Sequence, residues 1–465
     1  MSFELNEECG IFGISVNDLS PDLIKDLYLG IFALQHRGQE SCGIAYRKNG
    51  NIEVLKGKGL VTGEFFEMLP HDIDSTLGIG HVRYSTCGGS NIVNAQPLVF
   101  KCNKGEISIA HNGNIPMSEK IKNELIKTGS IFQTTSDSEI LIHMMSRIEG
   151  NDFKGSLISA LSNLKGAYSM LMMHENTLIA FRDPYGFRPL SYGQIGRGYV
   201  FSSETNALDL IGAKNVCDVK PGEIIFCSGD RIENENFTSS DKLQQCVFEL
   251  IYFARPDSYV FEESVYNARI KMGEKLSIKN DHEIDVVISI PDSGNSAALG
   301  FAKHAGVPFD FGMIRNHYTG RTFIRPEQKT RTEGVRIKLN PVKSVISGRR
   351  IAVVDDSIVR GTTSKKIVHM LRDAGAREVH MFFSSPEIKH SCFFGIDTPT
   401  EEELISSSNN PDQVAKLIGA DSVNFLELED LKKCLKCPED FCYACYDGNY
   451  KLDVRSGKHC ECENI

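Results

Sequence analysis

The sequence has no apolar run that reaches the roughly 18 residues of a membrane-spanning helix. Its start, MSFELNEE, is acidic and lacks both the basic segment and the apolar core of a secretory signal. No block concentrates Lys and Arg, and the formal net charge is −10, which argues against a nucleic-acid-binding surface. These absences favour a cytoplasmic protein with no membrane and no nucleic-acid partner, which holds small anionic ligands locally.

What is present is typical of a large globular α/β protein. The 465 residues include 41% hydrophobic and 24% charged residues and 40 glycines, and a chain of this length predicts about two to four domains. The 14 cysteines stand in a long chain without an export signal. They therefore indicate metal binding, catalysis or packing rather than disulfides.

The most informative stretch is VVDDSIVRGTTS, residues 353–364. An apolar run typical of a buried parallel strand precedes it, and apolar residues at helical spacing follow it. Open α/β sheets bind ligands in such a loop between strand and helix. Free N–H groups at the helix start favour a phosphate, while Asp355 and Asp356 suit sugar hydroxyls or Mg²⁺. The alternative is a tight turn capped by Thr and Ser.

This stretch resembles the phosphoribosyl pyrophosphate (PRPP) loop of type I phosphoribosyltransferases, in the version DDSIVRGTTS of the glutamine PRPP amidotransferase family. Further motifs extend the resemblance from Cys9 to about Tyr450. It implies that Asp355 and Asp356 orient the ribose of PRPP. It also implies that the 5′-phosphate is bound by Arg360, Gly361, Thr362, Thr363 and Ser364.

Cys9 stands in the string NEECGIFGI, at the expected start of a buried strand, where a core residue is the usual interpretation. The resemblance implies instead an N-terminal nucleophile glutaminase whose propeptide, residues 1–8, is removed. The freed α-amine, with an ordinary pKa of about 8, would then act as the base for the Cys9 thiol. The string LQHRGQES, with Arg37 and Gly38, supports the family only weakly, because a helix C-cap explains it equally well.

The resemblance implies four further residues of a glutamine site. Arg83, in GHVRYSTCG, would hold the substrate carboxylate, and Asp137, in TSDSE, its α-ammonium group. Asn112 and the N–H of Gly113, in HNGN, would form the oxyanion hole. Each motif has a structural alternative: a surface salt bridge for Arg83, a hairpin turn for HNGN and a helix N-cap for Asp137.

We expect an α/β protein whose first domain is α+β. The resemblance implies an N-terminal nucleophile glutaminase sandwich (αββα) over residues 9–240. It implies a type I phosphoribosyltransferase doubly wound sheet over residues 241–465, which also include a cysteine-rich tail. Residues 231–245 are polar without apolar periodicity, so we place the boundary there, to within about ten residues.

Two other stretches of the second domain match the family. The loop 291–294, Pro-Asp-Ser-Gly, corresponds to the pyrophosphate loop, and Ser293 would join Asp355 and Asp356 near Mg²⁺. An ordinary helix cap is the alternative. Residues 316–340 hold Arg and Lys among other polar residues with only scattered apolar ones, and they are too long for an idle connection. They resemble the flexible loop that folds over bound PRPP, and a solvated basic loop is the alternative.

The string CLKCPEDFCYAC holds two CxxC pairs, a spacing that by itself suggests zinc. The resemblance is to the cluster-bearing branch of the family. It implies a [4Fe–4S] cluster on Cys246, Cys392, Cys442 and Cys445. Because the reaction moves no electrons, the cluster would be a structural clasp for the tail and would make the enzyme oxygen-sensitive. Zinc stays open as the alternative.

The remaining cysteines have no role that the resemblance assigns. We interpret four of them as free thiols in a polar tail, with a second metal site as the alternative: Cys434, Cys437, Cys460 and Cys462. Five isolated cysteines are interpreted as packing residues: Cys42, Cys87, Cys102, Cys217 and Cys227.

The implied reaction hydrolyses glutamine at Cys9 through a thioester and passes ammonia internally to PRPP. The products are glutamate, pyrophosphate and 5-phosphoribosylamine, in the first committed step of de novo purine synthesis. Inhibition by purine nucleotides and a homotetramer are further implications. Three alternatives remain: a regulatory PRPP-binding protein with an inactive glutaminase, another amidotransferase such as hexosamine-6-phosphate synthase or asparagine synthetase, and a redox sensor.

Overall fold

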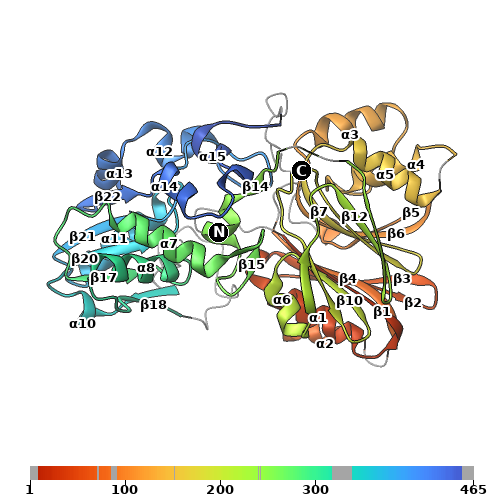
Figure 1. Ribbon diagram of the computed structural model, residues 1–465, viewed down its shortest axis with the longest axis horizontal. Helices are drawn as coiled ribbons and strands as arrows, with labels where there is room; N and C mark the ends of the chain where they lie inside the picture. The colour runs from red at the N-terminus through yellow and green to blue at the C-terminus, as the bar shows by residue number, and fades with distance from the viewer. Residues whose placement is uncertain are drawn as a thin grey trace.

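The computed structural model describes residues 9–70, 73–84, 92–150, 152–238, 240, 242–316 and 338–452. Two domains lie side by side along its long axis (Figure 1). One holds the strands β1 to β13, and the other is built on the parallel strands β17, β20, β21 and β22. The proposed propeptide, residues 1–8, lies outside the described residues.

The first sheet of the N-terminal domain has the strand order β11-β9-β10-β1-β4-β2-β3. In chain order its strands are β1 (Gly10–Ser20), β2 (Ser41–Lys48), β3 (Asn51–Lys58), β4 (Ser75–Arg83), β9 (Ser191–Ile195), β10 (Gly198–Ser202) and β11 (Lys214–Asp218). The centre of the sheet is antiparallel, with β1 and β2 on either side of β4. β1 is buried over its first seven residues, which confirms the buried strand expected after Cys9.

The second sheet has the order β13-β12-β8-β7-β6-β5. Its strands are β5 (Leu98–Cys102), β6 (Gly105–Asn114), β7 (Ala167–His174), β8 (Thr177–Arg182), β12 (Glu223–Ser228) and β13 (Arg231–Asn236). Apolar side chains of both sheets, including Ile11 and Ile79 from the first and Leu171 from the second, form one buried cluster. The two sheets therefore pack face to face, as in other β-sandwiches.

Helices cover the outer faces of this sandwich. On the first sheet, α1 (Leu23–Ala33) buries Leu23, Leu27 and Ile31, spaced four residues apart as one helical face requires. The other helices of the domain are η1 (Gln35–Arg37), α2 (Gly63–Glu67), η2 (Ile92–Asn94), α3 (Ser118–Lys127), α4 (Glu139–Ser146), α5 (Phe153–Asn163) and α6 (Thr205–Ile211). Because α4 and α5 pack on the second sheet, the αββα arrangement is confirmed.

The polar stretch 231–245 is more ordered than its sequence indicates. Residues Arg231–Asn236 form β13, which pairs antiparallel with β12 at the edge of the second sheet. Most of its side chains are exposed, which explains why no apolar pattern marks it. The lack of apolar periodicity therefore does not exclude a strand here, and the domain boundary that we placed at 231–245 stays a prediction.

The C-terminal domain is a parallel sheet with the order β17-β20-β21-β22. Its strands are β17 (Val286–Ser289), β20 (Arg350–Asp355), β21 (Glu378–Phe383) and β22 (Ser422–Phe425). Helices α7 (Val265–Ser277) and α8 (Asn295–Ala305) cover one face, and α11 (Thr362–Asp373) and α13 (Pro411–Ile418) cover the other. Helices on both faces confirm the expected doubly wound sheet.

Short elements complete this domain. The strands are β14 (Gln245–Cys246), β15 (Tyr259–Val260), β16 (Glu263–Ser264), β18 (Met313–Arg315), β19 (Leu339–Pro341) and β23 (Phe441–Cys442). The helices are η3 (Glu249–Phe253), α10 (Lys343–Ile346), η5 (Glu401–Glu403), α12 (Ile405–Ser408), α14 (Leu428–Lys433), η6 (Pro438–Asp440) and α15 (Ala444–Asp447). β14 and β23 pair in parallel, so the tail returns to the start of the domain.

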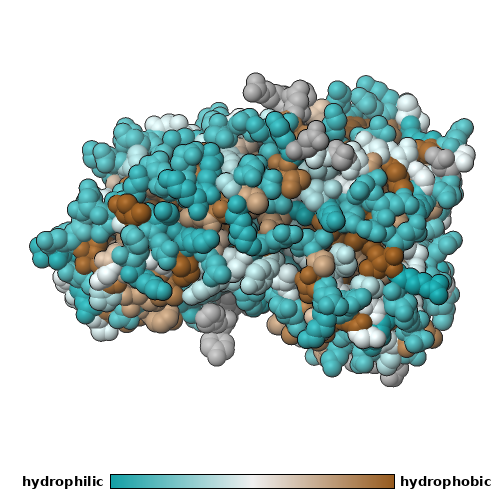
Figure 2. All heavy atoms as spheres, viewed as in Figure 1, coloured by the Kyte–Doolittle hydropathy of each residue, from teal (hydrophilic) through white to brown (hydrophobic). Residues whose placement is uncertain are grey.

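Polar residues cover most of the face seen in Figure 2, and the hydrophobic residues on it form separate patches. Among the described residues, no helix combines the length and apolar character that a bilayer crossing requires. The apolar side chains are mainly gathered into the cores on the two faces of each sheet.

Candidate active sites

Cys9 lies directly before β1, beside the end of β4. Gly10 pairs with Val82 in the antiparallel register, which brings Cys9 next to Arg83. The Cys9 thiol donates a hydrogen bond to the carbonyl oxygen of Tyr84 at 3.3 Å, and its own carbonyl accepts one from Arg37 Nε at 3.0 Å. The thiol is half-buried and in no disulfide. The candidate nucleophile is thus held at a strand end with both its thiol and its carbonyl engaged.

Arg83 is the last residue of β4 and is 4% exposed. A surface salt bridge is therefore the wrong interpretation of this side chain. Two residues earlier, His81 is fully buried, and its Nε2 donates to the carbonyl oxygen of His111 on β6 at 3.0 Å. Burial lowers the pKa of His81 to about 3, so the ring stays neutral. This bond joins the end of the Cys9 sheet to the opposite sheet.

Asn112 and Gly113 lie inside β6, paired with Ser169 and Tyr168 of β7, so the hairpin interpretation of HNGN was wrong. The turn-like Asn-Gly pair is overridden because β7 supplies backbone partners for the whole segment. Both side-chain polar atoms of Asn112 are buried, and neither has a hydrogen-bond partner in the part of the chain that is described. A buried amide without a partner is unfavourable unless a ligand completes it.

Gly113 has φ +140°, and a Cβ there would lie 2.0 Å from the carbonyl oxygen of Ala167. Only glycine fits, because both the backbone conformation and the neighbouring strand exclude a side chain. The backbone at this position is thereby fixed next to the unpartnered amide of Asn112. This pair is suited to stabilise an oxyanion.

Asp137 is not the N-cap of α4, because Ser138 occupies that position and no side chain caps the helix. The Asp137 carboxylate instead accepts the N–H of Ile115 at 2.9 Å and lies 3.4 Å from His111 Nδ1. Burial acts to raise the pKa of Asp137. The charge and hydrogen bond of His111, together with the hydrogen bond from the Ile115 N–H, outweigh burial and hold the pKa below its ordinary value. An ionised carboxylate beside residues 111–115 suits an ammonium ligand.

Arg37, which the sequence analysis used only as weak support for the family, has a larger structural role than its motif indicated. It ends η1, is fully buried, and donates to Glu204 at 2.6 Å and to both oxygens of Glu249 at 2.7 and 2.9 Å. Glu204 belongs to the first domain and Glu249 to the second, where it opens η3. The interpretation of Arg37 as a simple C-cap missed that it joins the Cys9 carbonyl to both domains.

The PRPP-loop candidate has the predicted strand, loop and helix. β20 ends at Asp355, and α11 begins at Thr362 after Gly361, whose φ is +75°. The N-cap position of this helix is Gly361 itself, which has no side chain to cap it. The loop therefore leads into a helix N-terminus, where backbone N–H groups and the helix dipole favour an anion.

Side chains around the loop fall into two groups. Thr363 and Ser364 are in the first turn of α11, while Arg360 is exposed and lies 3.4 Å from Glu403. Asp355 and Asp356 are buried, at 8% and 6% exposure. The two groups put hydroxyl and cationic side chains and a buried carboxylate pair on one loop.

The loop 291–294 reaches this acidic pair. Burial raises the pKa of Asp356, while hydrogen bonds with Ser293 and Ser357 and the charge of Arg269 act to lower it. The N-cap of α8 is Gly294, so Ser293 faces the carboxylate rather than capping a helix. Ser293 therefore lies close to Asp356 of the acidic pair, as we expected.

The expected flexible loop, 316–340, lies mostly outside the described residues, which stop at 316 and resume at 338. Its two ends are the antiparallel strands β18 and β19, paired from Met313 with Pro341 to Arg315 with Leu339. Both ends of this loop are thus held in one ribbon of the second domain.

Four cysteines line one enclosed cavity at the domain junction: Cys246, Cys392, Cys442 and Cys445. Apolar side chains form the rest of its wall, among them Phe187 and Phe394. Burial raises the pKa of the Cys445 thiol well above its ordinary value, and its three neighbouring cysteines add to the rise. The other three thiols are close enough to Cys445 to interact with it, although the four come from three separate parts of the chain, around residues 246, 392 and 442–445.

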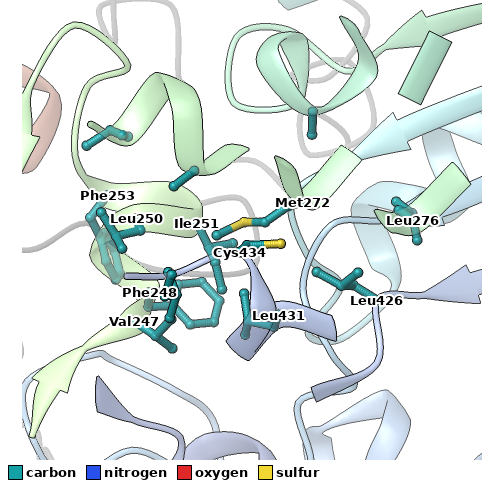
Figure 3. Packing of buried hydrophobic residues seen from close by; sticks show 14 of the residues in the cluster. Val247, Phe248, Leu250, Ile251, Phe253, Met272, Leu276, Leu426, Leu431 and Cys434 are labelled. Carbon is teal, nitrogen blue, oxygen red and sulfur yellow. The ribbon is translucent and has the colours of Figure 1, made fainter. Parts of the chain in front are cut away.

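Cys434 is not in a polar tail, as we expected, but 1% exposed in a hydrophobic core. Figure 3 shows its side chain among Ile251, Met272 and Leu431. It is the C-cap residue directly after α14, and its thiol donates to the carbonyl of Asp430 at 3.2 Å. The lysines beside it made this stretch look polar in the sequence, although α14 buries only one of its faces.

The other cysteines divide by burial. Cys42 and Cys227 are buried, as expected for packing, and Cys102 is half-buried. Cys217 is exposed on β11, so its interpretation as a packing residue was wrong. Cys437 is also exposed. Cys87, Cys460 and Cys462 lie outside the described residues.

Comparison with known proteins matches residues 81–210 to a family of glutamine amidotransferase domains. The amidophosphoribosyltransferase of Bacillus subtilis is 44% identical over 97% of this chain and 95% of its own length. The Archaeoglobus fulgidus amidophosphoribosyltransferase is 43% identical over 98% of this chain and 100% of its own length. The chloroplast amidophosphoribosyltransferase 1 of Arabidopsis thaliana is 47% identical over 96% of this chain and 79% of its own length. The chain belongs to the amidophosphoribosyltransferase family.

A solved structure of this family, the glutamine PRPP amidotransferase of B. subtilis in complex with ADP and GMP, superimposes with a TM-score of 0.90. It is 42% identical, and the match covers 97% of this chain and 99% of that one. Amidophosphoribosyltransferases thus match both domains. The alternative of an amidotransferase that shares only the first domain was wrong.

Proposed function

We propose that this chain transfers the amide nitrogen of glutamine to PRPP and releases 5-phosphoribosylamine, pyrophosphate and glutamate. This is the first committed step of de novo purine synthesis. One observation carries the proposal: a single chain of this family holds, in its first domain, a cysteine at the start of a buried strand together with an unpartnered buried amide and, in its other domain, an acidic pair beside a helix N-terminus.

In the first half-reaction, Cys9 acts as the nucleophile. Removal of residues 1–8 would free its α-amine as a base, so that no histidine is needed. Sulfur attack forms a tetrahedral intermediate whose oxyanion is stabilised by Asn112 and the Gly113 N–H. Its collapse releases ammonia and leaves a thioester, which water hydrolyses to glutamate. Arg83 and Asp137 orient the carboxylate and ammonium groups of glutamine.

In the second half-reaction, ammonia displaces pyrophosphate from C1 of PRPP. Asp355 and Asp356 orient the ribose hydroxyls, and the 5′-phosphate is held by Arg360, Gly361, Thr362, Thr363 and Ser364. Residues 316–340 would close over PRPP and exclude water, which keeps ammonia unprotonated.

Mg²⁺ is the metal we propose at this site. The oxygen donors of Ser293, Asp355 and Asp356 fit a hard cation, and the buried carboxyl of Asp356 would gain from a positive partner. When bound, Mg²⁺ supplies positive charge that neutralises the pyrophosphate leaving group.

We also propose a [4Fe–4S] cluster on Cys246, Cys392, Cys442 and Cys445. An apolar cavity lined by Cys445 and the three cysteines that act on its thiol fits a group that binds thiolates and needs protection from water. No group of three or more His, Cys, Asp or Glu side chains in the described residues is arranged as a metal-ion site, these four cysteines included. The proposal therefore rests on their lining one cavity. The cluster would supply a structural clasp for the tail, without electron transfer.

The assembly and regulation remain proposals. Inhibition by purine nucleotides is supported by the B. subtilis structure in complex with ADP and GMP. A homotetramer is carried over from the family resemblance. A cytoplasmic location also remains a proposal, because relatives from Arabidopsis thaliana are chloroplast proteins.

The test begins with anaerobic purification, N-terminal mass, metal analysis and pyrophosphate release from glutamine and PRPP. We expect Cys9 as the first residue and about four irons with four sulfides per chain. Cys442→Ser should lose most of the iron, while the exposed Cys437→Ser, its matched control, should keep it. Zinc without iron would overturn the cluster proposal, and absence of pyrophosphate release would overturn the function.

A further inference from the structure

The segment 392–395 of the second domain lies directly on the oxyanion-hole strand of the first. The carbonyl oxygen of Phe393 accepts a hydrogen bond from Asn114 Nδ2 at 2.9 Å. The next carbonyl, of Phe394, accepts from Arg188 Nε at 3.1 Å and from its Nη2. The Phe394 ring also stacks on Phe187 with centroids 4.4 Å apart. Consecutive residues of one domain therefore bind the other domain through backbone and ring.

Gly395 makes the closest approach. Its φ is +110°, and a Cβ at this position would lie 3.3 Å from the carbonyl carbon of Gly113 and 2.7 Å from Arg188 Nη2. Backbone from the two domains is packed here without an intervening side chain, which only glycine permits. Gly113 is therefore enclosed on one side by Ala167 of its own domain and on the other by the second domain.

The segment itself is fixed by local bonds. The N–H of Cys392 donates to Thr398 Oγ1 at 2.6 Å, and the hydroxyl of Ser391 donates to the carbonyl of Pro399 at 2.8 Å. On the first-domain side, Arg188 is fully buried and lies 3.6 Å from Glu249, the partner of Arg37. Both sides of the contact are thus held rigidly enough to transmit position.

An oxyanion hole requires such rigidity, because its donors must already point at the charge that develops in the transition state. Asn112 and Gly113 lie near the end of β6, where Asn114 is the last residue of the strand. We propose that the segment 392–395 is a positioning element that holds this strand end in its catalytic geometry. The inference rests on the proposed glutaminase function and adds a role for the second domain in it.

Two variants test the contact from its two sides. Asn114→Ala removes the donor to Phe393, and Gly395→Ala places a methyl group against Gly113 and Arg188. The matched control is Gly419→Ala, a positive-φ glycine of the same domain at the end of α13, where no atom approaches a Cβ within 3.8 Å. This control separates the effect of strain at a positive-φ position from the effect of disturbing the contact between the two domains.

The readouts separate oxyanion stabilisation from general damage. We expect kcat for glutamine hydrolysis to fall about tenfold or more in both variants, with KM changed by less than about twofold. Affinity for glutamate γ-semialdehyde, whose adduct with Cys9 places an oxyanion in the hole, should fall in parallel. Alkylation of Cys9 by iodoacetamide and ammonia-dependent synthesis should stay within about twofold, because neither uses the hole. Gly419→Ala should leave all four unchanged.

Asn112→Ala distinguishes failure of this inference from failure of the proposed function. If Asn112→Ala weakens semialdehyde binding while Asn114→Ala and Gly395→Ala leave it and kcat unchanged, the positioning role is wrong and the oxyanion hole stands. If Asn112→Ala itself has no effect, the assignment of the oxyanion hole is wrong. A parallel loss of alkylation and ammonia-dependent activity would also overturn the positioning role, because it would indicate general unfolding.

Discussion

The two candidate sites differ in how their groups are brought together. In the second domain, residues 355–364 come from one loop between β20 and α11, so the site follows from local chain geometry. In the first domain, Cys9, Asn112 and Asp137 come from separate elements, which buried residues such as His81 and Arg37 connect. A site built from one loop depends little on distant packing, whereas a dispersed site depends on it throughout.

The largest expected effect tests whether the two sites are separable. Cys9→Ala should lower glutamine-dependent pyrophosphate release by about 10³-fold or more, because the nucleophile is lost. Ammonia-dependent release should persist, since the second site is complete without Cys9. Parallel assays with glutamine and with ammonium salt measure the two. Equal loss in both would contradict separate sites.

A substitution in the second domain's site should instead affect both assays. Asp356→Ala removes a carboxylate from the ribose and Mg²⁺ site, and we expect glutamine-dependent and ammonia-dependent synthesis to fall together by about 10²-fold. Asp412→Ala, on the exposed start of α13, is the control. Retention of ammonia-dependent synthesis by Asp356→Ala would show that this acidic pair is not part of the PRPP site.

The dispersed site should also be the more sensitive to loss of buried partners. Glu249→Ala would leave the fully buried Arg37 and Arg188 without their shared carboxylate. We expect the free energy of unfolding to fall by about 3 kcal/mol, the usual effect of removing one partner of a buried ion pair. Urea denaturation measures it, and Glu427→Ala, in an exposed pair with Lys279, should have little effect.

The smallest expected effect is a pH dependence of stability that arises from Glu204, the other carboxylate bound by Arg37. Burial acts to raise the pKa of Glu204, but His36 and Arg37 outweigh it and hold the pKa well below its ordinary value. A lowered carboxyl pKa contributes stability that is complete above the unfolded-state value of about 4.3 and is lost as pH falls. The wild type should therefore lose stability below about pH 4.3 more steeply than Glu204→Gln, by up to about 1.4 kcal/mol per pH unit. Equal slopes in urea titrations would contradict this.

The sequence predicted the second site more completely than the first, for the same physical reason. The strand before residue 355 and the helix after residue 361 both follow from apolar spacing, and both are present. HNGN instead reads as a turn, yet it lies in a strand because β7 pairs along its whole length. The position of Asp137 before a helical pattern is typical of an N-cap, yet its carboxylate accepts the N–H of Ile115 instead. Local propensity gives way where tertiary partners are available.

The sequence by itself determined the periodic elements, the α/β class and the contiguous loop 355–364, because these depend on residues that are neighbours in the chain. Only the tertiary structure decided that Arg37 joins Cys9 to Glu249, that Cys434 is buried and that Gly395 lies against Gly113. These contacts link residues far apart in the chain. No local pattern records them, because each partner is chosen by tertiary packing, within a domain for Cys434 and between the domains for Gly395.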